Sequence, residues 1–402
     1  MARVSFIVIA DDLTGAAEIA AIGNRHGLAA LVVTDVRPPT GNADLVVYDT
    51  DSRLDQPGVA AEKVANLARV LAAHPRDLVY KKTDSVLRGA VRAELESLAA
   101  GLGCSRVVLV PANPTLGRVV REGHYAIGGV PLHHTTFARD PHHPATTDSV
   151  RELLGSNGKL AVTSLNATDR MPTTGLIAGN ATNRADLDAW ARQLTTDILP
   201  AGGAEFFSAV LSSRGLAPVG HPTGFFPAAP TLVVSGTASS AGAILRDTGR
   251  RDHVPIVPMP AEALSESPAA LAAAMRWIDA LQSQLATAGR AIAVFDGPHS
   301  ADPHVAAAVR AAFANCVREL VDRGALRHLI IEGGATAATI TSALGWHELQ
   351  IAHEWSTGVA SLQPVGNVPV IVTMKPGSYG WPEALWKHVL HPHPTSSAVA
   401  KS

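Results

Sequence analysis

The stretch VIADDLTGAA, residues 8–17, decides how the first part of the chain must fold. The apolar run Val4–Ala10 is typical of a buried strand, and helical spacing begins at Gly15. Nucleotide-binding α/β proteins usually place glycines in such a strand-to-helix turn. Here the turn carries Asp11 and Asp12 instead, and two carboxylates repel a phosphate. The stretch therefore predicts an α/β domain whose first strand ends at a site other than a phosphate cradle.

The rest of the chain repeats this alternation. Short apolar runs alternate with alanine-rich stretches at helical spacing, which favours an α/β fold with mostly parallel sheets. The strands expected in the first half are Val4–Ala10, Leu28–Thr34, Asp44–Thr50, Asp77–Lys82, Arg106–Val110 and Lys159–Ser164, and the helices are Gly15–His26, Val59–Ala73 and Ala90–Ala100. After residue 230 we expect strands at Thr231–Ser235, Ala291–Phe295, Arg327–Glu332 and Val368–Met374, and helices at Val305–Arg323, at Thr336–Leu344 and from Pro382.

The stretch GLAPVGHPTGFFPAAP at 215–230 interrupts the alternation with prolines and glycines, and is the best linker candidate. A chain of 402 residues is too long for one ordinary core. We therefore predict two α/β domains, residues 1–225 and 226–402.

Composition narrows the classes of partner. The formal net charge of −2 gives no electrostatic basis for binding nucleic acid or an anionic membrane, so we expect small-molecule partners or copies of the chain itself. The two cysteines, Cys104 and Cys316, form no CxxC pair, which argues against a disulfide framework or structural zinc. No signal-peptide pattern and no run of about 18 apolar residues occurs, so we expect a cytoplasmic protein.

The segment 111–147 differs from the rest because it is rich in glycine, proline and histidine. So long a loop is usually functional, and here it could be a lid or an arm for a homodimer. Its adjacent histidine pairs point different ways on an extended chain, and no HExxH accompanies them. We favour solvent-facing or hydrogen-bonded histidines over a metal site.

The residues after each expected strand matter most, because open α/β sheets bind ligands at the carboxyl ends of their strands. In the first half these residues mix acids with bases. The candidates are Asp11, Asp12, Arg53, Lys82, Thr83, Asp84, Ser85 and Arg88. The cations suit a carboxylate and the aspartates suit hydroxyl donors, so the set predicts a small sugar acid as ligand. Helix capping by Asp12 or Thr14, and by Asp84 or Ser85, is the competing interpretation, at about 1 kcal/mol each.

The second half shows the opposite chemistry. Three expected strands end in glycine-bearing loops, at 233–242, 330–339 and 372–385. Such loops bring backbone N–H groups and helix N-termini to phosphates, and Lys375 could add a charge. The hydroxyls that could join them are Ser235, Thr237, Ser239 and Thr336. Tight packing turns are the alternative. Together the two halves predict phosphoryl transfer in an interdomain cleft, with a carboxylate as base and Mg²⁺ on the nucleotide.

Several motifs, in order, resemble the four-carbon acid sugar kinase family: IADDLTGAAEIA, KKTDSVLRG, GRVVREGHYAIGGVPLHHTTFARDPHHP, VVSGTASS and EGGATA. The resemblance implies an N-terminal substrate domain, a C-terminal ATP domain and phosphorylation of threonate, erythronate or 3-oxo-tetronate at a terminal hydroxyl. It implies Asp11 or Asp12 as the catalytic residue, and Arg53 and Lys82 to Ser85 as substrate contacts. The implied ATP contacts are Ser235, Gly236, Ser239, Gly333, Gly334, Gly358, Lys375, Gly377 and Gly380.

Two rival functions remain open. One is a kinase of another small sugar acid, oxo or branched, because the loops SGTASSAG and KPGSYG depart from the family pattern. The other is a non-catalytic two-domain protein that binds a sugar acid. A dehydrogenase is not favoured, because GxGxxG follows none of the expected strands.

Overall fold

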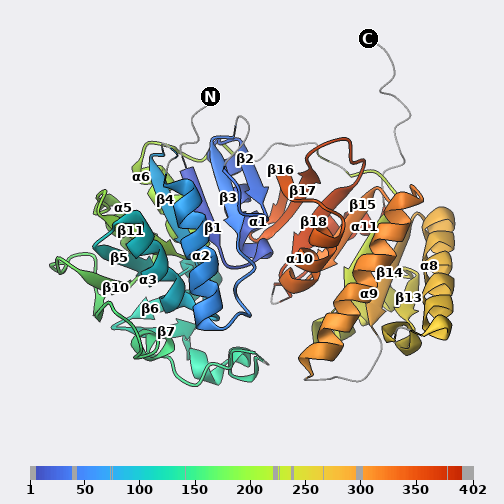
Figure 1. Ribbon diagram of the computed structural model, residues 1–402, viewed down its shortest axis with the longest axis horizontal. Coiled ribbons are helices and arrows are strands. Elements are labelled where there is room, and N and C mark those ends of the chain that lie inside the picture. The colour runs from blue at the N-terminus through green and yellow to red at the C-terminus, as the bar shows by residue number, and fades with distance from the viewer. Residues whose placement is uncertain are drawn as a thin grey trace, which may run out of the picture. The chain divides into compact units, whose positions relative to one another are not determined.

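A computed structural model describes residues 6–38, 43–72, 74, 76–140, 142–220, 225, 227–236, 240–265, 267–295, 302–377 and 379–391 (Figure 1). The chain divides into two compact units, residues 1–220 and 221–402, a few residues before the predicted boundary. Each unit is an α/β layer structure, so the predicted α/β class with mostly parallel strands is confirmed. Among the described residues, no helix has both the length and the apolar character needed to cross a bilayer.

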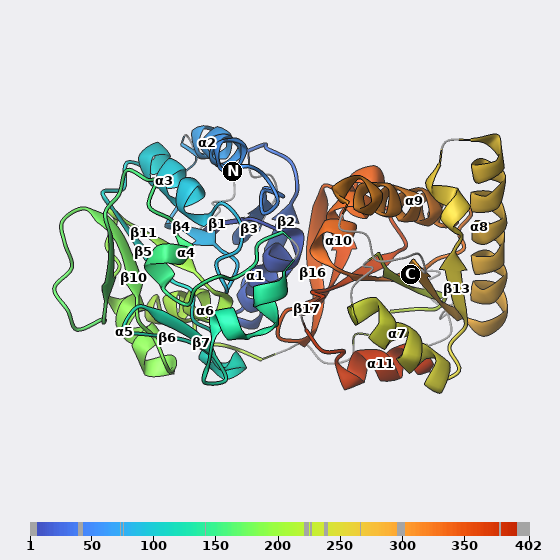
Figure 2. The same cartoon turned by 90° about the horizontal axis from the view of Figure 1, so that it is seen from below.

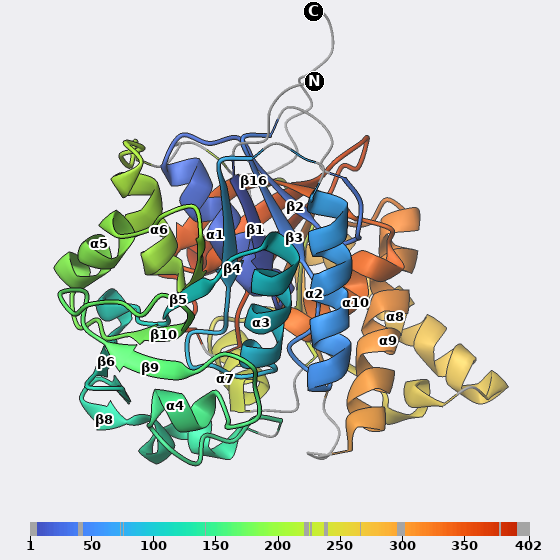
Figure 3. The same cartoon turned by 60° about the vertical axis from the view of Figure 1, so that its left-hand side comes forward.

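Unit 1 is built on a parallel sheet in the order β2-β3-β1-β4-β11-β5-β10-β9. Its strands are β1 (Phe6–Ala10), β2 (Ala30–Val33), β3 (Leu45–Asp49), β4 (Leu78–Lys82), β5 (Arg106–Val110), β9 (Val162–Leu165), β10 (Gly175–Gly179) and β11 (Ile198–Gly202). Its helices are α1 (Leu13–Arg25), α2 (Pro57–Leu71), α3 (Val91–Leu102), α4 (Val150–Leu153), α5 (Arg184–Arg192) and α6 (Ala204–Ser213). Helices α2 and α3 cover one face, and α1, α5 and α6 cover the other (Figures 2 and 3).

This topology brings together the loops that the sequence singled out. Because β1, β3 and β4 are parallel neighbours, the residues after Ala10, Asp49 and Lys82 lie at one edge of the sheet. Strand β1 is buried along its whole length, which explains its uninterrupted apolar sequence. Helix α1 is also buried from Leu13 to Gly23, and its small residues allow close packing against β3.

The segment 111–147, expected to be a long loop, contains regular structure. Strands β6 (Arg118–Arg121), β7 (His124–Ile127) and β8 (Val130–Pro131) form a small antiparallel sheet. Short 3-10 helices accompany it: η1 (Pro114–Leu116), η2 (Leu132–His134) and η3 (Thr136–Arg139). The expectation of a loop was wrong because glycine turns separate very short strands, whose buried Val120 and Tyr125 are too few to give a periodic pattern.

Unit 2 has the strand order β13-β14-β12-β15-β18-β17-β16, parallel from β13 to β18 and antiparallel beyond. Its strands are β12 (Thr231–Ser235), β13 (Ile256–Met259), β14 (Arg290–Phe295), β15 (His328–Glu332), β16 (Glu348–Ser356), β17 (Val359–Pro364) and β18 (Ile371–Lys375). Its helices are α7 (Ser240–Arg251), η4 (Ala261–Leu264), α8 (Pro268–Ala288), α9 (Pro303–Asp322), α10 (Gly334–Ala343) and α11 (Glu383–Leu390). The antiparallel hairpin β16–β17 turns at Gly358, which has φ +77°.

A buried histidine lies in the core of unit 2. His328 is fully buried, and its Nε2 is hydrogen-bonded to Thr373 Oγ1 at 2.7 Å. Burial, with a smaller contribution from His388, lowers the pKa of His328 well below its usual value. The unfolded chain therefore takes up a proton near pH 6.5 that the folded unit does not.

This difference predicts a pH-dependent stability. The free energy of unfolding should fall as the pH drops below about 6.5, by up to about 1.4 kcal/mol per pH unit from this residue. Urea unfolding followed by tryptophan fluorescence measures it, because only Trp190 lies outside unit 2. His328→Gln, which keeps a partner for Thr373, should lose this component, and an unchanged slope would contradict the assignment.

Candidate functional site

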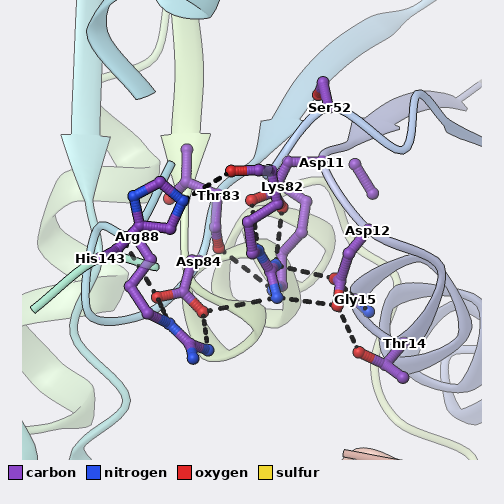
Figure 4. A network of polar contacts seen from close by, with 12 residues as sticks. Asp11, Asp12, Thr14, Gly15, Ser52, Lys82, Thr83, Asp84, Arg88 and His143 are labelled. Atoms are coloured by element: carbon purple, nitrogen blue, oxygen red, sulfur yellow. Dashed lines mark hydrogen bonds and ion pairs between the residues drawn. The ribbon is translucent and has the colours of Figure 1, made fainter. Parts of the chain in front are cut away.

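The centre of the unit 1 site is a cluster of two aspartates around one arginine (Figure 4). Arg53 donates from Nε and Nη2 to Asp11 at 2.8 and 2.9 Å, and from Nη1 and Nη2 to Asp12 at 2.7 and 2.8 Å. Burial disfavours the charged form of Arg53 and so lowers its pKa. The carboxylates of Asp11 and Asp12 outweigh this effect and raise the pKa of Arg53 well above its ordinary value. Arg53, expected to bind a substrate carboxylate, is thus largely engaged by the protein's own acids.

The two aspartates differ in how their oxygens are used. Asp12 caps helix α1, accepting from the backbone N–H of Gly15 at 2.8 Å and from the hydroxyl of Thr14 at 2.5 Å. With its two bonds from Arg53, Asp12 accepts four hydrogen bonds, which is the capacity of a carboxylate. Among the described residues, Asp11 accepts only the two from Arg53, so its oxygens keep unused capacity. The capping interpretation therefore describes Asp12 and not Asp11.

Backbone hydrogen bonds fix the loop that carries Arg53. The N–H groups of Ser52 and Arg53 both donate to the carbonyl of Asp11, at 3.0 and 3.1 Å. Asp51, just before them, has φ +41°, a conformation costly for a residue with a side chain. Strain of this kind persists only where the surroundings impose it, so the loop is held in one arrangement against the end of β1.

Asp84 and Arg88 form a second charged pair beside this cluster. Arg88 donates from Nε and Nη2 to Asp84 at 3.0 and 2.9 Å, and Arg53 Nη1 lies 3.8 Å from Asp84 Oδ1. Burial would raise the pKa of Asp84, but Arg88 and Arg53 hold it far below its usual value. Asp84 also accepts from the backbone N–H groups of Val86 and Arg88, at 3.2 Å each. It therefore stays ionised and shapes the turn after β4.

Lys81 and Lys82, the two lysines of the motif KKTD, each lie close to a buried glutamate that was not among the predicted site residues. Lys81 Nζ lies 3.2 Å from Glu94 of α3, and both side chains are almost completely buried. Lys82 Nζ lies 3.5 Å from Glu18 of α1 and donates to the carbonyl of Thr83. Each glutamate lies on a helix face that packs against the sheet. An acidic residue on an otherwise apolar helix face is the sequence feature from which these two buried acids could have been predicted.

Two polar groups of the same loop complete the set. The hydroxyl of Thr83 is fully buried and has no hydrogen-bond partner among the described residues. Such a group costs about 1–3 kcal/mol unless a ligand or water satisfies it. The hydroxyl of Ser85 accepts a short hydrogen bond from Arg118. All eight residues predicted to form the sugar-acid site lie at the carboxyl ends of the neighbouring strands β1, β3 and β4 or in the loops that follow them.

Gly89 allows the loop that follows β4 to approach the loop that carries Arg53. Its φ is +88°, and a β-carbon there would lie 3.0 Å from the Arg53 carbonyl oxygen. Gly89→Ala should therefore lower the unfolding free energy by about 1–3 kcal/mol and displace Arg53. Gly103→Ala is the matched control, because Gly103 has φ +70° with no atom near the added methyl group. Urea unfolding of both variants measures the effect, and equal losses would show that the contact with Arg53 is unimportant.

Unit 2 carries a buried ion pair at the ends of β15 and β18. Lys375 Nζ lies 2.7 Å from Glu332 Oε1, and each side chain is 1% exposed. The hydroxyl of Ser235, at the end of β12, donates to Glu332 Oε2 at 2.8 Å. The Lys375 ammonium also lies 5.3 Å from the centre of the Trp381 ring. Lys375 is thus not a free surface charge, and Glu332 is its partner, for which the sequence analysis assigned no role.

The glycines predicted to hold a nucleotide include those in the loops that follow β12, β15 and β18, the strands that carry this pair and Ser235. A β-carbon on Gly236 would lie 2.7 Å from Thr336 Oγ1, so the loop after β12 closely approaches the start of α10. Gly333 precedes α10 with φ +104°, and Gly334 is its first residue. Gly358 lies against the ring of Tyr379, where a β-carbon would be 2.3 Å from Cε2. Gly377 and Gly380 flank that tyrosine in open space, whereas Thr237 and Ser239 lie outside the described residues.

Metal ligation is not supported in the described part of the chain, where no group of three or more acidic, cysteine or histidine side chains could hold an ion. His124 and His133 instead face Asp148, with Nδ1 at 3.3 and 3.8 Å from its Oδ1.

The fold and these two sets of residues define a two-domain α/β protein with an acid-and-base site in one unit and glycine loops around a buried lysine in the other. Two family models match the chain. A sugar-binding N-terminal domain covers residues 6–210, and a nucleotide-binding C-terminal domain covers residues 232–385.

Full-length relatives give the same result. A D-threonate kinase of Cupriavidus necator is 32% identical, with 95% of this chain and 96% of the relative aligned. A 3-oxo-tetronate kinase of Methylobacterium radiotolerans is 26% identical over 92% and 95% of the two chains. A crystal structure from Salmonella typhimurium LT2 shares the fold, with a TM-score of 0.75, 22% identity and coverage of 94% and 97%. The chain belongs to the four-carbon acid sugar kinase family, and the predicted family and kinase class are confirmed.

Proposed function

We propose that the protein transfers the γ-phosphoryl group of ATP to the terminal hydroxyl of a four-carbon sugar acid such as threonate, erythronate or 3-oxo-tetronate. The observation that carries the proposal is the Asp11–Arg53–Asp12 cluster, at the strand ends of a sugar-binding domain whose chain continues into a nucleotide-binding domain. Acids and bases at adjoining strand ends suit a ligand that has both hydroxyls and a carboxylate.

Asp11 is the residue we assign to the acceptor hydroxyl, because its oxygens keep capacity for a further donor. Burial would raise the pKa of Asp11, but Arg53, helped by Lys81 and Lys82, lowers it below the usual value. Asp11 is therefore ionised at neutral pH and is a weak base. Phosphoryl transfer through a loose transition state depends mainly on positioning, so orienting the hydroxyl is the main task we assign to it.

The glycine loops after β12, β15 and β18 are our candidates for the ATP phosphates. Glycine loops and the N-terminus of α10 offer backbone N–H donors, and Lys375 supplies a positive charge held by Glu332. We expect Mg²⁺ to enter bound to the ATP phosphates. In proteins this ion usually keeps several of its waters and binds only one or two carboxylates besides the substrate phosphates. Bound Mg²⁺ would neutralise charge that develops on the phosphates. We also predict that the protein is cytoplasmic, where ATP is available. The formation of a homodimer is a further prediction.

An assay of ADP release across four- and five-carbon sugar acids tests the proposal. We expect turnover with at least one four-carbon acid that depends on ATP and Mg²⁺. A lack of turnover across the panel, with no ATP binding at millimolar concentration, would contradict it. Turnover only with longer or branched acids would favour the kinase of another sugar acid. Acid binding without ATP binding would favour the non-catalytic protein.

A further inference from the structure

A pocket of about 210 Å³ opens beside Arg88 in unit 1. One wall is the turn 86–89, and the other is formed by the segment 143–147 with Phe137, Glu152 and Leu153. Polar side chains line both walls: Arg88 on the first, and His143, Thr146, Thr147 and Glu152 on the second, where Glu152 accepts from Thr147. Small-molecule sites usually combine such a concavity with a few converging polar groups.

The pocket is attached to the sugar-acid site by hydrogen bonds. Asp140 accepts from Arg88 Nη1 at 2.9 Å and from the backbone N–H groups of His142 and His143, at 3.0 and 2.9 Å. His143 Nε2 lies 2.9 Å from the carbonyl oxygen of Arg53 (Figure 4). The wall that carries His143 is therefore hydrogen-bonded to the backbone of the Arg53 loop.

Three cations were expected to bind the carboxylate of a sugar acid, and the structure distinguishes them. Arg53 uses four hydrogen bonds on Asp11 and Asp12, and Lys82 is only 5% exposed and lies beside Glu18. Arg88 is 23% exposed, and three of its five N–H groups are engaged by Asp84 and Asp140. Of the three, Arg88 alone lines the pocket.

We infer that this pocket binds the carboxylate end of the sugar acid, with the two remaining N–H groups of Arg88 as its principal donors. Arginine suits this task because its planar fork matches a carboxylate. Asp84 and Asp140 hold the guanidinium in place, and the ring of Phe137 lies 5.4 Å from its central carbon. The Thr147 hydroxyl already donates to Glu152 at 2.6 Å, and His143 Nε2 is bonded to the Arg53 carbonyl, so Arg88 and not these side chains supplies the donors. The inference rests on the proposed function, since it assigns one end of that substrate.

The test compares a four-carbon sugar acid with its uncharged amide, which has nearly the same shape. Measured as kcat/KM, which does not require saturation, the wild type should prefer the acid by about 100-fold, the effect of charge-assisted hydrogen bonds. Arg88→Gln should reduce that preference to within about threefold, by losing activity on the acid and not on the amide. Arg88→Lys, which keeps a charge near Asp84 and Asp140, should retain an intermediate preference.

Arg106→Gln is the matched control. Arg106 is 19% exposed and pairs with Asp197 at 2.7 Å, but it begins β5 at the opposite edge of the sheet. It should leave the preference for the acid unchanged. Equal losses on acid and amide in Arg88→Gln would mean a structural role and would overturn the inference, as would a wild type without preference or a preference that survives the substitution. A wild type that phosphorylates neither compound would instead overturn the proposed function.

Discussion

Asp11→Asn is expected to lower kcat by about 10²-fold, the loss that misplacing a reacting group by about 1 Å can cause. Asparagine keeps the size of the side chain but loses one negative charge facing Arg53 and one acceptor oxygen. The acceptor hydroxyl would then be poorly oriented. Steady-state kinetics with a four-carbon acid measures the change.

Asp12→Asn is the matched comparison for this substitution. Asp12 caps α1 and also pairs with Arg53; asparagine caps a helix about as well as aspartate, so the replacement should weaken mainly the ion pair with Arg53. We expect a smaller loss of kcat than for Asp11→Asn. The assignment of Asp11 would be wrong if Asp12→Asn lost more activity while both variants remained folded.

Lys375→Met is expected to lower the unfolding free energy of unit 2 by about 3–5 kcal/mol, because it leaves Glu332 buried without its cation. ATP affinity should fall as well, since the charge assigned to the phosphates is removed. Tryptophan-monitored urea unfolding measures stability, and titration calorimetry measures ATP binding.

The double variant Lys375→Met, Glu332→Leu separates the two effects. Replacing both members of a buried pair by apolar groups is often neutral for stability, so most of the lost stability should return. ATP affinity should stay low. Recovery of ATP affinity together with stability would show that Lys375 has only a structural role.

The fold was predictable where strands are buried on both faces. Strand β1 is apolar throughout and its neighbour β3 nearly so, and such runs are readily separated from the alanine-rich helices. Strand β16 was missed because it is largely half-exposed and its sequence, ELQIAHEWS, alternates irregularly. Strand β11, with the sequence ILPAG, was missed because proline and glycine weaken a strand pattern.

The sequence could predict where the residues of the candidate site lie, but not which of them form ion pairs with one another. The rule that ligands bind at strand ends located both sets of residues. It could not show that Arg53 would be held by Asp11 and Asp12, because that contact joins residues about forty positions apart through the neighbouring strands β1 and β3. Glu332 carried a usable signal, since it is a charged residue that ends the apolar run 329–331 of its strand, much as Asp11 follows the apolar strand β1.

Identification of the product distinguishes phosphoryl transfer to the sugar acid from simple hydrolysis of ATP. Wild-type protein is incubated with ATP, Mg²⁺ and a four-carbon sugar acid, and the product is analysed by phosphorus–proton correlated NMR. We predict one equivalent of ADP for each phosphate ester, with the ester on the terminal carbon of the acid. An ester at another carbon, or the release of inorganic phosphate without a phosphorylated acid, would contradict it.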